Sequence, residues 1–187
     1  MEDLFPLGRL DPEGEDVRHI PALTYRIQPT NGGGERLRIG VQGLSVFRSL
    51  LSLLEPPYWV LYVLIVPRTG GIEPGRYQSP ETVSSDKLDA FLDEFGDFLE
   101  SDGRHELWMK SASTPGLLVY DRHEIVYGYG DLDRMKAVLE VEGYTPGEVD
   151  IPNPHSHHYH HQNDETLRRM IGEWNWAYSP LQPSDEP

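Results

Sequence analysis

The run Tyr58-Trp59-Val60-Leu61-Tyr62-Val63-Leu64-Ile65-Val66 is the stretch of sequence that decides the fold. Its apolar side chains occupy odd and even positions alike, so a strand formed by this run would be buried on both faces. Pro56 and Pro57 precede it and separate it from a helical pattern at 44–54. The run therefore predicts a strand in the middle of a sheet.

Alternating apolar and polar residues predict two β-hairpins, one before and one after this strand. The first hairpin pairs 23–27 with 37–41 through the turn-rich segment 29–34. The second pairs 117–120 with 125–129 around Asp121-Arg122-His123-Glu124. Hairpins, rather than regular strand–helix–strand units, favour a largely antiparallel sheet with helices on one face.

Apolar residues at helical spacing predict three further helices, each with a polar residue at its start. The clearest begins at Ser84 or Ser85 and ends near Gly103. A second helix is capped by Asp131, and the last by Asp164.

The resulting fold prediction is a single α+β domain over residues 1–187. We expect a mostly antiparallel sheet of about five to seven strands, with three or four helices packed mainly on one face. Within the domain, residues 1–20 are expected to form a loosely ordered acidic arm, and residues 179–187 a frayed tail.

The charge of the chain is strongly negative. Its 187 residues include 31 acidic and 16 basic side chains, for a formal net charge of −15. This sign argues against direct binding of nucleic acid and against an anionic membrane surface, because both require a positive field. One interpretation of the charge is solubility alone. The other is a surface that binds a basic protein partner.

The sequence contains no cysteine, which excludes disulfides, thiolate metal sites and a cysteine nucleophile. Residues 1–16 carry acids and prolines, so we expect no secretory signal there. The longest apolar run is far shorter than the ~20 residues of a membrane-spanning helix. These features together predict a cytoplasmic protein.

Five of the eight histidines lie close together, at His155, His157, His158, His160 and His161. Imidazole is a common ligand for zinc and other transition metals, so these five residues are candidate ligands of a divalent metal. In an extended chain His155, His157 and His161 would point to one side, and the other two histidines to the opposite side. The alternatives are a polar loop without metal and a pH sensor that gains charge near about pH 6.

A row of acids lies on the predicted helix that starts near Ser84. Asp89, Asp93 and Asp97 are four residues apart and share one helix face, and Glu100 follows them. One interpretation is a solvated face. The functional interpretation is a docking surface for a basic protein, because complementary charges speed association.

Trp174, Trp176 and Tyr178 alternate near the end of the chain, so an extended segment would place all three on one side. They are expected either to pack on the domain as a clasp or to contact a partner. Tryptophan and tyrosine are frequent in binding hot spots, which makes Trp174 and Trp176 candidate partner-binding residues.

No nucleotide-binding, serine-hydrolase or kinase motif occurs in the sequence. The leading hypothesis is a small acidic interaction protein that binds a basic protein partner without catalysis, as a toxin-neutralising immunity protein does. The alternative is a metal-dependent hydrolase that uses the histidines between His155 and His161 to activate water. A further alternative is a structural subunit of a larger assembly.

Overall fold

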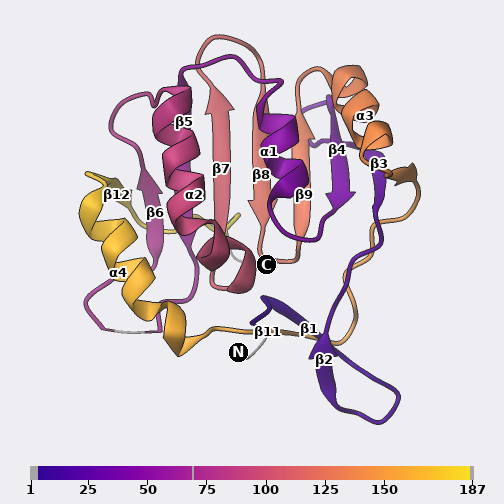
Figure 1. Ribbon diagram of the computed structural model, residues 1–187, viewed down its shortest axis with the longest axis horizontal. Coiled ribbons are helices and arrows are strands. Elements are labelled where there is room, and N and C mark those ends of the chain that lie inside the picture. Colours follow the sequence, from indigo (N-terminus) through magenta and orange to yellow (C-terminus); the bar gives the residue numbers. More distant parts are fainter. Residues whose placement is uncertain (1–3, 69, 186–187) are drawn as a thin grey trace.

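The computed structural model describes residues 4–68 and 70–185, which form four helices and twelve strands in two sheets (Figure 1). The larger sheet has nine strands, in the spatial order β10 (Thr145–Pro146), β3 (Thr24–Pro29), β4 (Glu35–Gly40), β9 (Ile125–Tyr129), β8 (Leu117–Asp121), β7 (His105–Ser111), β5 (Tyr58–Leu64), β6 (Gly75–Gln78) and β12 (Ala177–Ser179). Neighbouring strands in it are antiparallel except for β10 and β3, which run parallel. The smaller sheet has three antiparallel strands, in the order β11 (His155–His157), β1 (Leu7–Leu10) and β2 (Asp16–Arg18).

Helices cover one face of the larger sheet (Figure 1). They are α1 (Ser45–Leu51), α2 (Ser85–Ser101), α3 (Leu132–Val141) and, after the short 3-10 helix η1 (His161–Asn163), α4 (Asp164–Glu173). The predicted α+β fold, with a mostly antiparallel sheet and helices mainly on one face, is confirmed. The sheet is larger than the expected five to seven strands. Its edge strands β10 and β12 contain only two and three residues, too few to show an apolar period.

The hydrophobic core lies between the helices and the sheet. Tyr62 and Leu64 of β5 face the helices and are fully buried, and Phe91 and Phe95 of α2 pack against this face. Burying one such side chain contributes about 1.5–3 kcal/mol. α2 begins where predicted, because the Ser84 hydroxyl accepts a hydrogen bond from an amide of the first turn.

The run that decides the fold forms β5, but this strand is not in the middle of the sheet. It is the third strand from one edge, between β7 and β6, and β8 is the central strand. Trp59 and Leu61 of β5 point away from the helices and are only partly buried. The run is therefore apolar on both sides even though only one side is covered by helices.

The expected loose arm at residues 1–20 is wrong for residues 7–18, which contain β1 and β2. Leu7 is completely buried, and its carbonyl accepts a 2.9 Å hydrogen bond from the amide of His19. Strands of three or four residues give no clear alternation, and β11, one partner of β1, is more than a hundred residues away in sequence. Residues 1–3 of the arm lie outside the described residues.

The expected frayed tail is also wrong for residues 179–185. β12 pairs with β6, and Asp185 is 5% exposed and forms an ion pair with Arg76 at 3.3 Å. The last two residues of the tail lie outside the described residues. Within the described parts of the chain, no helix combines the length and the apolar composition needed to cross a membrane.

Candidate metal centre

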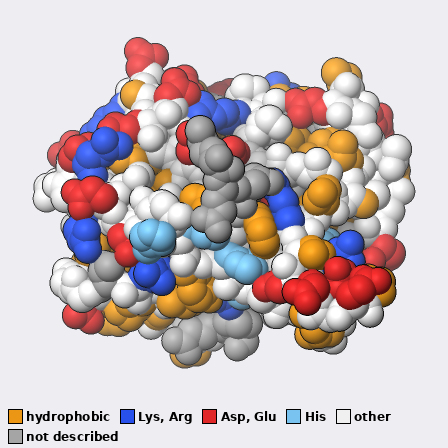
Figure 2. Space-filling view, turned by 60° about the horizontal axis from the view of Figure 1, so that its bottom comes forward, with side chains coloured by type: hydrophobic (Ala, Val, Ile, Leu, Met, Phe, Trp, Pro, Cys, Tyr) orange, Lys and Arg blue, Asp and Glu red, His pale blue; other side chains and the backbone are white. Residues whose placement is uncertain are grey.

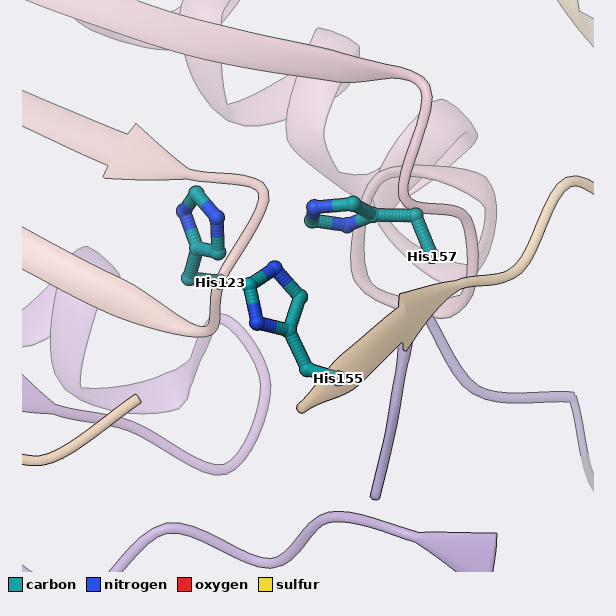
Figure 3. Close-up of side chains that lie close together, drawn as sticks. All are labelled: His123, His155 and His157. Carbon is teal, nitrogen blue, oxygen red and sulfur yellow. The ribbon is translucent and has the colours of Figure 1, made fainter. Parts of the chain in front are cut away.

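Two histidines of the smaller sheet and one from a turn of the larger sheet meet at the end of the molecule that carries the smaller sheet. His155 and His157 belong to β11, and His123 lies in the turn between β8 and β9. One ring nitrogen of each lies within 4.8 Å of the corresponding nitrogens of the other two. Figure 3 shows the three imidazoles turned toward one another, and Figure 2 shows histidine side chains at the surface of this end of the molecule.

His123 is oriented by the turn that contains it. The Asp121 carboxylate accepts a 2.6 Å hydrogen bond from the backbone amide of His123 and lies 2.5 Å from Nδ1 of the His123 ring. Glu124 completes the turn with a φ of 56°. Because Nδ1 is occupied by the carboxylate, Nε2 is left as the atom that can bind an ion. A carboxylate on the far nitrogen is the usual support of a metal-bound histidine.

His155 and His157 have different surroundings. The Nδ1 atom of His155 lies 2.9 Å from the Pro152 carbonyl oxygen, which leaves its Nε2 free. The Nδ1 atom of His157 is buried and has no hydrogen-bond partner among the described residues. Burial, reinforced by the nearby Arg122 and His123, lowers the pKa of His157 to about 3. This ring is therefore neutral at neutral pH, which is the form that binds metal.

The triangle of nitrogens is slightly wider than a bound ion requires. Zinc–nitrogen bonds of about 2.0–2.1 Å in a tetrahedral site place the nitrogens about 3.3 Å apart. The three nitrogens lie within 4.8 Å of one another, so they must approach one another by up to about 1.5 Å to bind one ion. The arrangement can hold a divalent ion with three protein ligands.

A buried ionic network fixes the chain just after β11. The Arg104 guanidinium is completely buried and donates to Asp102 at 2.7 Å, to Asp164 at 2.9 Å and to the carbonyl of His160 at 2.8 Å. The Asp102 carboxylate also accepts from the His160 amide at 3.0 Å. Burial alone would raise the pKa of Asp102, but the Arg104 guanidinium holds that pKa below its usual value. The network thus ties the segment after β11 to the end of α2.

The remaining predicted ligands lie away from the three-histidine cluster. His158 lies 3.1 Å from Asp16, and the Nε2 atom of His160 lies 2.9 Å from the Phe5 carbonyl oxygen. These two rings stack on each other with centroids 6.1 Å apart. His161 is exposed in η1, where the chain has left the extended conformation on which its expected alternation depends. The structure therefore brings together two of the five predicted histidines, with His123 in addition.

Ser156 and His158 also meet Asp16, over the backbone of Gly8. The Ser156 hydroxyl lies 2.8 Å from both Asp16 oxygens and 3.3 Å from Nε2 of His158. That same Nε2 atom is the one that contacts Asp16. A catalytic serine triad needs the acid on the opposite ring nitrogen from the serine. This group of side chains is therefore a polar cross-link between β2 and β11 rather than a proton relay.

A further histidine lies beside the cluster. His19 follows β2. Its amide donates a hydrogen bond to the carbonyl of Leu7, and Leu7 in β1 is the pairing partner of His157 in β11. Its Nε2 is buried without a hydrogen-bond partner in the described part of the chain. Burial lowers the pKa of His19, and the nearby Arg9 and His155 lower it further. Neither His19 nor His123 lies near the other histidines in sequence. The sequence predicts that His123 lies in a hairpin turn, but not that this turn adjoins β11.

The acidic row is exposed along α2, as its spacing predicts. Asp89, Asp93 and Asp97 are all exposed, although Asp93 forms an ion pair with Arg48 at 2.7 Å. Glu100 has a structural partner, because it accepts a 2.9 Å hydrogen bond from the amide of Leu44 at the start of α1. Two of these four acids are thus engaged within the molecule.

Trp174 and Trp176 pack on α2. Their rings are stacked with centroids 5.2 Å apart, and the ring of Trp174 lies 4.6 Å from that of Phe91. The indole nitrogen of Trp176 donates to the Met170 carbonyl at 3.1 Å. Both side chains are partly buried against the core, so they form a clasp between α4 and α2.

Comparisons with protein-family models, with curated proteins and with solved structures find no match to this chain. The function of this chain is therefore inferred from the geometry of its site.

Proposed function

We propose that the protein binds one divalent transition-metal ion, with zinc as the best fit, through His123, His155 and His157. The observation that carries this proposal is the convergence of three imidazole nitrogens within 4.8 Å from two separate sheets. The hydrogen bonds at Nδ1 of His123 and His155 support it, because they aim the other nitrogen of each ring at a common point.

Three histidine ligands favour a catalytic ion. Catalytic zinc sites use three protein ligands and keep a fourth position for water, whose pKa the ion lowers to about 7. The activity that such a site supports is hydrolysis, so a metal-dependent hydrolase is the enzyme function that we propose. His19 bears on this point, because a fourth protein ligand would close the site and make the ion structural.

The test is the metal content of protein expressed without a tag, purified by anion exchange and never exposed to immobilised nickel. We expect about one zinc, iron or manganese ion per chain, and loss of that ion in His123→Ala and in His157→Ala. The matched control is His161→Ala, which removes an exposed histidine of the same segment. The proposal would be contradicted if the protein is folded and free of metal. It would also be contradicted if His161→Ala loses metal as completely as His123→Ala.

The His19→Ala variant tests whether His19 occupies the fourth coordination position of the ion. A catalytic site predicts unchanged metal content, and hydrolysis of a chromogenic ester or phosphoester that disappears in His155→Ala. A structural site predicts that metal affinity falls in His19→Ala and that no hydrolysis of these substrates is detected. The second result would remove the hydrolase and leave metal binding in place.

A second candidate function is binding of a basic protein partner by the acidic face of α2. Two observations favour it: Asp89 and Asp97 are exposed without an ion pair in the described residues, and the whole chain carries −15. Complementary charge steers such a partner and makes association sensitive to salt. Trp174 and Trp176, which pack on α2 and remain partly exposed, are the apolar residues that we assign to this surface.

The variant Asp89→Lys/Asp93→Lys/Asp97→Lys tests this second function. We expect it to lose a partner that the unchanged protein captures from cell extract at low salt. The matched control, Glu13→Lys/Glu15→Lys/Glu35→Lys, makes the same change in net charge at exposed sites outside α2. Equal capture by both variants would show that the acidic face is not the binding surface.

A further inference from the structure

The sheet face opposite the helices carries its own set of side chains. α1, α2 and α3 all lie on the other face (Figure 1). Cross-strand pairing places the outward residues of the strands in rows that run across the sheet, and two of these rows lie side by side. The first row is Arg26, Arg38, Tyr127, Val119, Trp108, Leu61 and Gln78, and the second is Gln28, Arg36, Tyr129, Leu117, Lys110 and Trp59.

These two rows have a composition opposite to that of the whole chain. They contain four cations, four aromatic residues and no acid, although the protein carries −15. Arg26 has an acidic neighbour, because it forms an ion pair with Glu148 from outside the rows. We call this surface the arginine–aromatic face.

The side chains of the arginine–aromatic face are ordered by one another. The Arg36 guanidinium lies 4.1 Å from the centre of the Tyr127 ring and donates a 2.9 Å hydrogen bond to the Tyr129 hydroxyl. A guanidinium over an aromatic ring at this distance forms a cation–π pair, here called the Arg36–Tyr127 plate. The Nε atoms of Arg36 and Arg38 are buried without a partner among the described residues. Both arginines are thus held along the sheet.

A hollow of about 330 Å³ lies in the same face, between β5, β6, β7 and β8. Two indole rings, from Trp59 and Trp108, line it together with Leu61 and Leu117, and Lys110 and Gln78 provide its polar groups. This volume is at the lower end of the roughly 300–1,000 Å³ typical of ligand sites. The hollow can accept a flat ring close to a cation.

We propose that the arginine–aromatic face binds single-stranded nucleic acid. Phosphates would lie against Arg26, Arg38 and Lys110, and bases would stack on the indoles of the hollow and on the Arg36–Tyr127 plate. Aromatic side chains and guanidinium planes on an open sheet are a recurring platform for unstacked bases. A simple anion would use only the cationic side chains of this surface.

The net charge does not exclude this binding. The acids of α2 lie behind the sheet, and charges more than about 8 Å apart are largely screened at physiological ionic strength. Three acids do lie on the outward side at the end of the sheet nearest the metal centre: Glu106 and Asp121 in the strands, and Asp185, which pairs with Arg76. They mark where the binding surface ends.

The test uses fluorescein-labelled single strands of twelve deoxythymidines or twelve uridines, with anisotropy and tryptophan fluorescence as readouts. Three phosphate contacts predict a loss of affinity of roughly 10- to 20-fold between 50 and 200 mM salt. The indole fluorescence should be quenched on binding. Trp108→Ala should weaken binding by roughly 5- to 150-fold, the effect of losing one stacked base.

Two charge variants separate this surface from general electrostatics. Lys110→Glu changes an exposed side chain of the face and should weaken binding strongly, whereas Arg168→Glu makes the same change on α4 and should not. No binding at 50 mM salt, or equal loss of affinity in both variants, would overturn the proposal.

Self-association of the protein would also overturn it, if the association depends on concentration and Lys110→Glu abolishes it. That result would assign the arginine–aromatic face to the acidic helix of a second copy. We expect the affinity for the labelled strands to be the same with and without added zinc, and the same in His123→Ala. This inference can therefore be tested separately from the metal proposal.

Discussion

The Asp121 carboxylate lies 2.5 Å from Nδ1 of His123 and binds the backbone amide of the same residue. This double contact fixes both the turn and the ring, and it sets which nitrogen faces His155 and His157. The three-histidine cluster therefore depends on a residue that is not itself one of its three candidate ligands.

Asp121→Asn is the first variant that we would make. The amide cannot accept from the imidazole as strongly as the carboxylate, so the ring becomes a weaker and less well-oriented ligand. We expect zinc affinity to fall by about 10- to 100-fold in competition with a chromophoric chelator. The Asp133→Asn variant, at an exposed site on α3, serves as the control. Unchanged affinity in Asp121→Asn would mean that His123 is not oriented in the way described.

Metal should stabilise the fold, because the ion would join β11 of the smaller sheet to the β8–β9 turn of the larger one. An ion at a thousandfold its Kd adds about 4 kcal/mol to the free energy of unfolding. We expect zinc to raise the midpoint of thermal unfolding, and a chelator to lower it. His155→Ala should remove the shift, and His161→Ala should retain it. Equal stabilisation of His155→Ala by zinc would place the ion elsewhere.

Arg104 is completely buried, and removing its charge should be costly. Arg104→Met leaves Asp102 without its main partner, and breaking a buried ion pair from one side costs about 3–5 kcal/mol. The control is Arg168→Met, which removes an exposed ion pair with Glu165 worth about 0–1 kcal/mol. Denaturant unfolding of both variants gives the comparison. A difference below about 1 kcal/mol between them would contradict the role given to the network.

Glu106 should make stability depend on pH. Burial, together with the charge of Asp121, raises the pKa of Glu106 from 4.5 to about 7. A carboxyl whose pKa is higher in the folded chain stabilises the fold fully below about pH 4.5, and this contribution is lost as the pH rises through about 7.

Glu106→Gln removes that titration. We expect the variant to be more stable than the unchanged protein at pH 8, by on the order of 1–3 kcal/mol, with the gap closing toward pH 4. The measurement is the free energy of unfolding by urea at several pH values. A gap that stays constant with pH would mean that the carboxyl is not held in its neutral form.

Much of the fold could be predicted from the sequence, because long strands and amphipathic helices have clear periods. The patterns that predict β5 and α2 are of this kind. The edge strands β10 and β12 and the small strands β1 and β2 are too short to show a period, and their partners are set by tertiary packing.

The candidate site was only half predictable. Alternation in an extended segment correctly groups His155 with His157, but it cannot show that a third ligand comes from a hairpin turn. The arginine–aromatic face was hidden for a related reason. Net charge sums over the whole chain, whereas Arg38 and Lys110 come to lie on one face only through the register of four strands, β4, β9, β8 and β7.

The central claim is that His123, His155 and His157 together bind one ion, and nuclear magnetic resonance of protein with ¹⁵N-labelled histidine tests it most directly. On addition of one equivalent of zinc, we predict that the side-chain nitrogen signals of these three histidines shift, through Nε2 for His123 and His155. The signals of His158, His160 and His161 should keep their positions. Shifts confined to those last three residues, or spread evenly over all eight histidines, would contradict the three-histidine centre.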